Sequence, residues 1–326
     1  MSRNDPIRFG FLSTAKINRL VLAGARESDS VEVVAVASRD QARADAYARE
    51  VGIPRAHGSY EALLADPDVD AVYISLPNSL HVDWSIAALE AGKHVLCEKP
   101  LARSPAEVER AFDAAARAGL FLMEAFMWRH NPQTARLREL VAQGVVGRLR
   151  LIRASFGFAL ADTSNIRLRA DVDGGSLMDV GCYCVSGSRL LAGEPEHVLG
   201  DQVVGATGVD VRMAATLAFG GDVLGQFDCG LDVATRDELE VIGSDASLFL
   251  DDPWHCRQPG IEVRRDGEVE RVEVERANSY RLELENLAAA IRGEAEPLLG
   301  RDDAVGQART IDALYRSASS GEAVRL

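Results

Sequence analysis

Short apolar runs alternate with stretches of helical periodicity through the first 125 residues, and this alternation constrains the fold more than any other feature of the sequence. The apolar runs predict strands at Ile7–Leu12, Val31–Ala37, Ala71–Leu76, His94–Cys97 and Leu120–Ala125. Nearly continuous apolar strands separated by helices are typical of a parallel sheet covered by helices on both faces. We therefore predict an α/β fold that begins with a doubly wound Rossmann domain over residues 1–125.

A different pattern follows the helix predicted from Asn131 to about Gln143. Apolar and polar residues alternate over 152–158 and 209–219, as in strands with one buried face. Gly220-Gly221-Asp222 and Asp266-Gly267 are hairpin signals, and helical patterns run over 174–192, 280–292 and 302–319. We predict that residues 126–326 form an α+β domain with a large, mostly antiparallel open sheet, which binds substrate and carries the subunit contacts.

Charge and composition narrow the class of partner. The 326 residues include 36 Lys and Arg against 50 Asp and Glu, for a formal net charge of −14. This acidic balance argues against nucleic acid and favours a small molecule. We expect a cytoplasmic protein without membrane association, because no apolar run approaches the ~20 residues of a membrane-spanning helix and no signal-peptide core follows the first residues. The five cysteines are scattered and odd in number, so we expect reduced thiols.

A degenerate dinucleotide-binding fingerprint follows the first predicted strand. The three glycine positions of G-x-G-x-x-G/A hold Gly10, Leu12 and Ala15, with Ser13 and Thr14 before the last of them. Such a turn presents backbone N–H groups and a helix N-terminus to a pyrophosphate. Leucine at the middle position leaves an ordinary strand–helix turn as the alternative, but the predicted sheet supports a nucleotide site.

The end of the second predicted strand indicates which dinucleotide binds. An NAD enzyme has an acidic residue there for the ribose hydroxyls, whereas this chain reads Ala37-Ser38-Arg39. A guanidinium can bind a 2′-phosphate bidentately, and Ser38 can donate a hydrogen bond to it. We therefore predict NADP as the cofactor. The alternative is that Arg39 is a solvated surface side chain.

Three residues stand in places suited to proton transfer beside such a cofactor. Lys99, within Glu98-Lys99-Pro100, follows the fourth predicted strand at the carboxyl edge, where open α/β sheets bind ligands. Asp179 and Tyr183 are four residues apart after a glycine pair, so on a helix they share a face. A solvated lysine and a packing tyrosine are each ordinary, but together with the Rossmann pattern they favour catalysis.

This combination resembles the glucose–fructose oxidoreductase/inositol dehydrogenase (Gfo/Idh/MocA) family over essentially the whole chain. Glu98-Lys99-Pro100 is the family's most specific marker, and the glycine pair through Tyr183 is similar to its substrate helix. Many members carry histidine where this chain has Tyr183. Tyrosine there, like the Leu-Ser-Thr-Ala loop, looks like the branch of dimeric dihydrodiol dehydrogenases, NADP-dependent xylose dehydrogenases and sugar ketoreductases.

The resemblance implies acid–base roles for the three residues. Tyr183 would give a proton to the developing alkoxide in carbonyl reduction and accept it in alcohol oxidation. A phenol titrates near ~10 in water, and the ammonium of Lys99 would favour the phenolate. Lys99 could itself be the principal acid–base group. Asp179 is expected to orient Lys99 or a substrate hydroxyl.

Further cofactor contacts are expected in two segments. The loop after the third predicted strand resembles the family's nicotinamide-side loop and places Leu76, Pro77, Asn78 and His81 there, with Glu98 and Lys99 after the fourth strand. Trp128 and Arg129 can frame the cofactor or a sugar, but core packing is equally open for them. Arg167 can reach a phosphate or the substrate.

Other chemistries lack a suitable constellation of residues. Cys182 and Cys184 would point to nearly opposite sides of a helix, and the six histidines show no ligand spacing, so we expect no metal site. No serine has a histidine beside it that suggests a hydrolase triad, and the Gly10 loop lacks the lysine of a P-loop.

We predict an NADP(H)-dependent oxidoreductase that transfers hydride between nicotinamide and a sugar or other cyclic polyol, as an aldose dehydrogenase or keto-sugar reductase. The alternatives are a trans-1,2-dihydrodiol dehydrogenase, a non-catalytic nucleotide-sensing regulator and redox-assisted glycoside cleavage. Apolar residues on the free face of the predicted sheet further predict a homodimer or homotetramer. The sequence leaves open which sugar reacts, at which carbon and in which direction.

Overall fold

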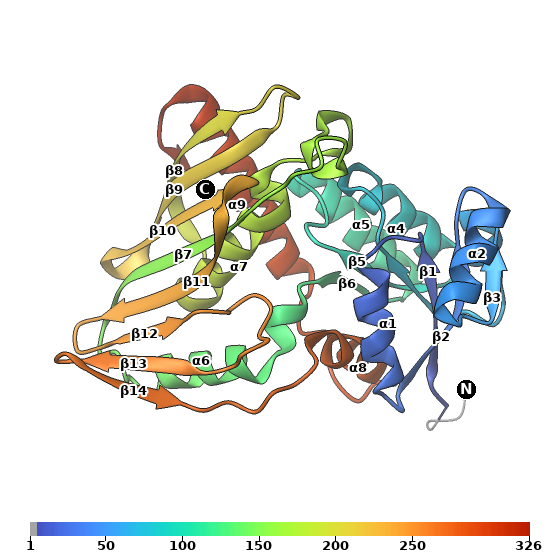
Figure 1. Cartoon of the computed structure of the whole chain (residues 1–326), viewed down its shortest axis with the longest axis horizontal. Helices are drawn as coiled ribbons and strands as arrows, with labels where there is room; N and C mark the ends of the chain where they lie inside the picture. The colour runs from blue at the N-terminus through green and yellow to red at the C-terminus, as the bar shows by residue number, and fades with distance from the viewer. Residues whose placement is uncertain (1–4) are drawn as a thin grey trace. The chain divides into compact units, whose positions relative to one another are not determined.

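The computed structural model describes residues 5–326, which form two compact units (Figure 1). The first unit comprises the chain up to Ala102, Ala106–Met127 and Asn278–Ala304. The second comprises Arg103–Pro105, Trp128–Ala277 and Val305–Leu326. The assignment of cofactor binding to residues 1–125 and of substrate binding to 126–326 stays a prediction.

The first unit is built on a six-stranded parallel sheet with the order β3-β2-β1-β4-β5-β6. The direction of winding reverses between β1 and β4, which creates the switch point where such sheets bind ligands. The predicted doubly wound Rossmann sheet is confirmed. Its elements are β1 Ile7–Leu12, α1 Asn18–Arg26, β2 Val31–Ala37, α2 Gln41–Val51, β3 Arg55–His57, α3 Tyr60–Leu64, β4 Ala71–Ile74, α4 His81–Glu90, β5 His94–Glu98, α5 Pro105–Ala118, β6 Leu122–Ala125 and α8 Ser279–Ile291.

The strands β1 and β2 have the predicted bounds, and the others differ at their ends. β4 ends at Ile74 rather than Leu76, and β6 begins at Leu122 rather than Leu120. The pair β3 and α3 was not predicted at all, because β3 has only three half-buried residues and carries no apolar run. Residues 278–304 cluster with this unit although they follow the second sheet in sequence.

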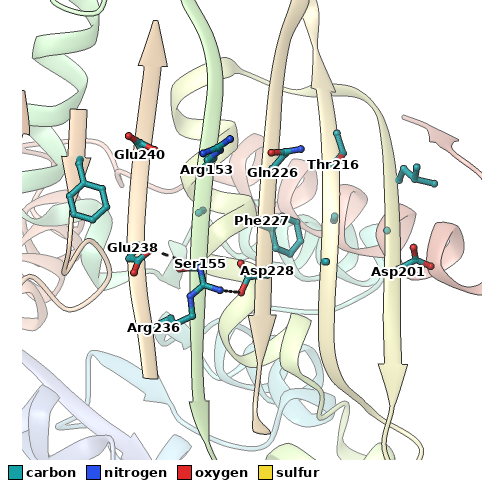
Figure 2. A pocket seen from close by; sticks show the side chains of 16 residues that line it. Arg153, Ser155, Asp201, Thr216, Gln226, Phe227, Asp228, Arg236, Glu238 and Glu240 are labelled. Atoms are coloured by element: carbon teal, nitrogen blue, oxygen red, sulfur yellow. Dashed lines mark hydrogen bonds and ion pairs between the residues drawn. The ribbon is translucent and has the colours of Figure 1, made fainter. Parts of the chain in front are cut away.

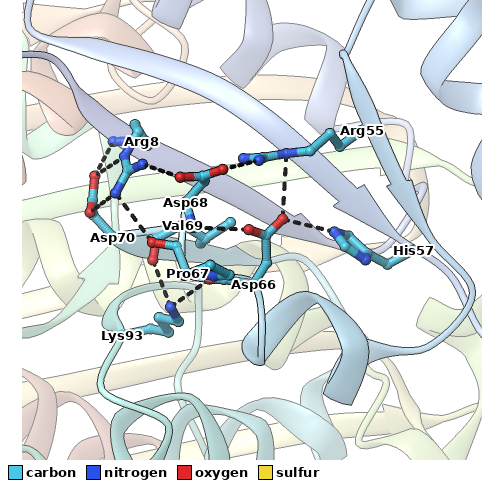
Figure 3. Close-up of polar contacts among 9 residues, drawn as sticks. All are labelled: Arg8, Arg55, His57, Asp66, Pro67, Asp68, Val69, Asp70 and Lys93. Carbon is cyan, nitrogen blue, oxygen red and sulfur yellow. Dashed lines mark hydrogen bonds and ion pairs between the residues drawn. The ribbon is translucent and has the colours of Figure 1, made fainter.

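A polar network closes the amino end of the parallel sheet (Figure 3). The Arg8 guanidinium donates to both oxygens of Asp70 at 2.8 and 2.9 Å, and the backbone N–H of Arg8 donates to Asp70 Oδ2 at 2.9 Å. The buried Lys93 donates its Nζ protons to the carbonyl oxygens of Asp66 and Val69 at 2.8 and 2.7 Å. These bonds tie the starts of β1, β4 and β5 together, away from the edge that binds ligands.

The second unit is built on a nine-stranded sheet with the order β14-β13-β12-β11-β7-β10-β9-β8-β15. Only β7 and β10 pair in parallel, so the predicted mostly antiparallel open sheet is confirmed. Its elements are α6 Pro132–Ala142, β7 Leu149–Ala159, α7 Cys182–Ala192, β8 Pro195–Val204, β9 Asp210–Phe219, β10 Val223–Gly230, β11 Asp232–Gly243, β12 Ser247–Leu250, β13 Ile261–Arg265, β14 Glu268–Val272, α9 Arg301–Ser320 and β15 Val324–Arg325, with short helical turns over 127–130, 166–168, 170–172, 177–181 and 220–222.

The predicted hairpins form where the turn residues allow a left-handed backbone. Gly221 and Asp222 have φ of 73° and 61° between β9 and β10, and Asp266 and Gly267 have φ of 51° and 84° between β13 and β14. Two consecutive residues with positive φ match the twist of the flanking strands.

The helix predicted over 174–192 begins later and in a different form. Leu177–Gly181 is a π-helical turn, and α7 continues from Cys182. Figure 1 shows α7 and α9 beside the sheet, and α7 packs against β7 and β10. All five cysteines are free and buried. Among residues 5–326, no helix has the length and apolar character needed to cross a membrane.

We predict that Asp70→Asn lowers the free energy of unfolding by about 1–3 kcal/mol, because it weakens a charge-assisted pair that is largely shielded from water. Burial alone would raise the pKa of Asp70, but the hydrogen bonds and charge of Arg8 outweigh it, and the carboxyl pKa lies below its ordinary value. The stabilisation is therefore present above the unfolded-state pKa of about 3.9 and is lost as the pH falls through the folded-state pKa.

Urea denaturation of wild type and variant across pH measures this difference. It should be constant above about pH 5 and shrink below about pH 4. Asp68→Asn is the matched control, because Asp68 pairs with Arg8 and Arg55 but is 56% exposed, and it should destabilise the protein less than Asp70→Asn does. Equal losses in the two variants would contradict the argument.

Candidate active site

The turn after β1 is held by a cluster of small polar side chains. Ser13 Oγ lies 2.7 Å from Ser75 Oγ and 3.1 Å from the Ser75 carbonyl oxygen, and Asn18 Nδ2 donates to the Ser13 carbonyl oxygen at 2.8 Å. Ser75 Oγ also donates to Asn18 Oδ1 at 2.6 Å. These bonds tie the predicted phosphate-binding turn to the end of β4 at the switch point. Sequence reasoning missed Asn18 and Ser75, because neither occupies a motif position.

Two residues of the fingerprint face protein rather than open space. A Cβ atom on Gly10 would lie 2.7 Å from Leu63 Cδ2 on α3, so glycine there permits close helix–sheet packing. The side chain of Leu12 is fully buried at the end of β1. Only the backbone of these two residues is available to a nucleotide, and their contact with one stays a prediction.

The end of β2 carries two guanidinium groups rather than the one predicted. Arg39 and Arg43 are both exposed, and Arg43 Nε donates to Thr14 Oγ1 of the β1–α1 turn at 2.9 Å. Burial raises the pKa of Tyr60, and the charges of Arg39 and Arg43 oppose that rise, which places both cations near one phenol. Ser38 is buried, and its N–H donates to the His57 carbonyl oxygen at 3.0 Å. Sequence reasoning missed Arg43, which stands one helical turn beyond Arg39.

His81 holds two loops together. Its ring is fully buried, with Nε2 2.9 Å from the Leu76 carbonyl oxygen and Nδ1 2.9 Å from the Pro100 carbonyl oxygen. Burial lowers the pKa of His81, and the charge of Lys99 adds to the effect. The imidazole thus lies between the loop that contains Pro77 and Asn78 and the Glu98-Lys99-Pro100 segment, and as a neutral ring it donates to one of the two carbonyl oxygens. A direct cofactor contact for His81, as for Leu76, Pro77 and Asn78, stays a prediction.

The lysine at the end of β5 has an acidic neighbour that is itself anchored. Tyr73 donates its hydroxyl proton to Glu98 Oε1 at 2.5 Å, and the Lys99 N–H lies 3.3 Å from Glu98 Oε2. Burial raises the pKa of Tyr73, and the Glu98 charge raises it further, so the phenol remains a hydrogen donor. Lys99 is one of three lysines in the sequence and is half-buried at the carboxyl edge.

Tyr183, on α7 of the second unit, packs in a cluster of aromatic side chains. Its ring meets Phe156 of β7 edge-on with centroids 5.3 Å apart, and lies 6.0 Å from Trp254. Tyr183 is 8% exposed. These contacts hold the phenol in one orientation.

Asp179, in the π-helical turn, pairs with an arginine. Arg167 Nε donates to Asp179 Oδ2 at 2.6 Å, and the Asp179 side chain is 15% exposed. Arg167 comes from the short helical turn 166–168. The predicted orientation of Lys99 or a hydroxyl by Asp179 stays a prediction, but the structure shows that Asp179 is itself oriented by Arg167.

The glycine pair before this turn is needed for packing. A Cβ on Gly174 would lie 2.5 Å from the Arg167 carbonyl oxygen, and one on Gly175, whose φ is 127°, would lie 2.1 Å from Asp210 Oδ1. Asp210 accepts hydrogen bonds from Ser176 Oγ and the Leu177 N–H, both at 2.7 Å. Protein groups therefore occupy the space beside both glycines.

Trp128 is a core residue of the second unit, and the half-buried Arg129 lies beside it. Trp128 is 1% exposed, and its ring meets Trp254 edge-on with centroids 5.1 Å apart. The Arg129 guanidinium lies 5.8 Å from the Trp128 ring and donates to Ser186 Oγ at 3.3 Å. Trp128 therefore packs in the core, which was the alternative to a ligand-binding role. Contact of either residue with cofactor stays a prediction.

One cluster with metal-ligand chemistry escaped the sequence analysis. Asp237, Asp252 and His255 offer ligand atoms within 4.8 Å of one another. Asp237 lies on β11 and the other two follow β12, so no sequence spacing indicated their meeting. The Arg257 guanidinium lies 3.4 Å from Asp252 Oδ1 and 3.7 Å from Asp237 Oδ2, so the protein supplies a positive charge to this cluster.

Comparison with known proteins identifies the family. Residues 7–126 match the family model described as "Oxidoreductase family, NAD-binding Rossmann fold", and residues 134–249 match "GFO/IDH/MocA C-terminal domain". The chain is 42% identical over 325 residues to D-xylose 1-dehydrogenase (NADP(+)) 2 of Haloferax volcanii, which covers 98% of this chain and 99% of the relative. It is 35% identical over 254 residues to trans-1,2-dihydrobenzene-1,2-diol dehydrogenase of Danio rerio, covering 77% of this chain and 76% of the relative.

A solved structure agrees with these matches. The crystal structure of KijD10, a 3-ketoreductase from Actinomadura kijaniata in complex with NADP and TDP-benzene, has a TM-score of 0.91 at 33% identity, covering 96% of this chain and 98% of that chain. The expected resemblance is confirmed across both units. The chain belongs to the Gfo/Idh/MocA family of oxidoreductases.

Proposed function

We propose that this chain is an NADP(H)-dependent oxidoreductase that transfers hydride between nicotinamide and a carbon of a sugar or other cyclic polyol. The observation that carries the proposal is a lysine, Lys99, at the carboxyl edge of a Rossmann sheet in a chain that also holds a phenol, Tyr183, fixed in an aromatic cluster. Relatives named as a xylose dehydrogenase and a 3-ketoreductase support the same class of substrate.

The residues that surround the end of β2 fit a 2′-phosphorylated dinucleotide. Arg39 and Arg43 provide two exposed guanidinium groups, and Thr14 adds a hydroxyl on the phosphate-binding turn. Guanidinium groups bind phosphate oxygens bidentately, whereas an NAD site would place a carboxylate there. NADP, when bound, supplies the hydride acceptor or donor.

The protein's own part in the reaction is proton transfer and orientation. In alcohol oxidation Tyr183 takes the hydroxyl proton, and Lys99 favours the phenolate that does so; in carbonyl reduction Tyr183 returns the proton. Asp179, oriented by Arg167, is proposed to hold Lys99 or a substrate hydroxyl. The proposal requires the ammonium and the phenol to reach the same reacting carbon.

A second candidate function is favoured by the aromatic cluster. Tyr183, Phe156 and Trp254 form a largely buried aromatic cluster, whose apolar character suits the unsaturated ring of a trans-1,2-dihydrodiol beside Tyr183, and a relative carries that name. A panel of sugars, keto-sugars and dihydrodiols, measured with NADP and NAD in both directions, separates the two activities.

The presence of both Lys99 and Tyr183 argues against a regulator without chemistry. Net NADPH formation would argue against redox-assisted glycoside cleavage.

We also propose that the chain is a cytoplasmic homodimer or homotetramer that associates through the open face of the nine-stranded sheet. This face, opposite Tyr183 and Phe156, has a hollow of about 570 Å³ (Figure 2). Arg153 stands in register between Glu240 and Gln226, and Arg236 pairs with Asp228 at 2.9 Å. A face with both signs of charge can be complementary to its own copy across a two-fold axis.

We predict that Lys99→Met and Tyr183→Phe each lower kcat by about 10²–10⁴-fold, because each removes a group that acts only while the proton moves. Steady-state turnover of the best substrate in the panel measures the loss. Tyr47→Phe, which removes a hydroxyl group from α2 of the first unit, is the control and should retain wild-type kcat. Near-normal turnover in either variant removes that residue from the mechanism.

We predict that Arg39→Ala and Arg43→Ala each raise the KM for NADP⁺ by about 10- to 100-fold and leave the KM for NAD⁺ nearly unchanged, because only NADP⁺ carries the 2′-phosphate. Kinetics with each nucleotide at saturating substrate measure the preference. Arg49→Ala, at the far end of the same helix, should change neither value. An unchanged preference in both variants would defeat the assignment of these guanidinium groups.

We predict a particle mass near two or four times 35.2 kDa in solution. Light scattering coupled to size exclusion at micromolar concentration measures it. Arg153→Glu should shift the mass toward the monomer, because it sets a second carboxylate beside Glu240 in the centre of the face. A monomeric wild type at that concentration would refute the proposed association.

A further inference from the structure

On the buried face of β11, a carboxylate occupies a position where the alternation of apolar and polar residues predicts an apolar side chain. Leu239 and Val241, which share that face, are 1% and 0% exposed, and Asp237 is 9% exposed. Asp237 stands directly opposite Phe156 across the β11–β7 pair. Burial raises the pKa of Asp237, and its bond to His255 opposes the rise. A buried carboxylate in such a place needs a partner of strong hydrogen-bonding character.

The partner is the imidazole of His255. Its Nδ1 lies 2.6 Å from Asp237 Oδ2, and Nδ1 also lies 3.3 Å from Arg257 Nη2. A carboxylate only accepts, so the shorter contact assigns the hydrogen to Nδ1. With its hydrogen on Nδ1, a neutral imidazole carries its lone pair on Nε2, on the side of the ring away from Asp237. Among residues 5–326 no group bonds to Nε2, and the His255 side chain is 38% exposed.

This imidazole stands at the edge of the aromatic cluster that contains the proposed catalytic phenol. Phe156 meets His255 edge-on at 5.4 Å and 85°, and meets Tyr183 edge-on at 5.3 Å and 75°. The two separations bound the distance between the His255 and Tyr183 rings at about 11 Å, which a single sugar ring with its hydroxyl groups can bridge. The Phe156 ring between them is apolar and 8% exposed, so the exposed His255 supplies a hydrogen-bonding group at the edge of the cluster.

We propose that His255, oriented by Asp237, accepts a hydrogen bond from a substrate hydroxyl remote from the reacting carbon, and so selects a polyol over a cyclic diol that lacks further hydroxyls. The inference rests on the proposed function and deepens it, because it assigns a specificity-determining residue to the same site. A purely structural role, in which the cluster of Asp237, Asp252, His255 and Arg257 only fixes the loop after β12, is the alternative.

Two variants separate these roles. His255→Phe keeps a planar ring against Phe156 and removes both nitrogens, and Asp237→Asn keeps the shape of the carboxylate but weakens its hold on the imidazole. D-xylose and trans-1,2-dihydrobenzene-1,2-diol are the probes. His255→Phe should raise the KM for D-xylose about 10-fold or more with kcat within about 3-fold, and leave the KM for the dihydrodiol within about 2-fold. Asp237→Asn should shift the same KM in the same direction by less.

Arg257→Ala is the matched control. It removes the guanidinium contacts with Asp237, Asp252 and His255 Nδ1 but keeps both partners of the 2.6 Å contact between His255 and Asp237. Wild-type KM values for both probes in Arg257→Ala support the proposal. If Arg257→Ala reproduces the change seen in His255→Phe, or if His255→Phe raises the KM for both probes alike, the role is structural and the proposal is overturned. His255→Gln, which retains a hydrogen-bonding group, should recover part of the D-xylose KM.

Equilibrium binding gives a readout that does not depend on turnover. Isothermal titration of D-xylose in the presence of NADPH, which cannot accept a hydride from the sugar, should show binding that is about 10-fold weaker for His255→Phe than for wild type. Binding of this kind without any turnover would defeat the proposed oxidoreductase function and leave the role of His255 supported. Failure of wild type to bind D-xylose, or equal binding by the two proteins, overturns the inference about His255.

Discussion

The free-energy cost of burying two carboxylates constrains how the second unit packs. Asp210 and Asp237 both lie on strands of the nine-stranded sheet with less than a tenth of their surface exposed, and each must be compensated by donors close at hand. Asp210 takes hydrogen bonds from Ser176, the Leu177 N–H and Tyr315, and burial still raises its carboxyl pKa. Its bonds fix the start of the turn that leads to Tyr183.

Asp237 positions the loop after β12, as Asp210 positions the turn that leads into α7. It holds His255 at the edge of Phe156, whose ring also contacts Tyr183. The contacts that compensate the buried charge of Asp237 therefore also position an imidazole beside the aromatic cluster. In the proposed function, this places a hydrogen-bonding group for a hydroxylated ring at the edge of an otherwise apolar cluster.

The first unit depends on a different constraint, which is that all strands of a parallel sheet end at the same edge. The turn after β1 is hydrogen-bonded to Ser75 after β4, and the His81 imidazole packs between the loop after β4 and the segment that holds Lys99. Three loops that are distant in sequence thus become one rigid edge. The side chains in that edge position the loops, and the exposed guanidinium groups of Arg39 and Arg43 are the groups that the proposed function assigns to a nucleotide.

The sequence by itself determined the order of the sheet-forming segments, the two hairpin turns and the family. Apolar periodicity and the φ demands of Gly221 and Gly267 are local properties, and Glu98-Lys99-Pro100 is a contiguous motif, so each can be recognised without coordinates. Only the tertiary structure decided that Arg43 joins Arg39, that the glycine pair serves Asp210, that Trp128 is core, and that Asp237 meets His255. These contacts join residues from different elements, and their energy depends on burial and cross-strand register, which no local pattern records.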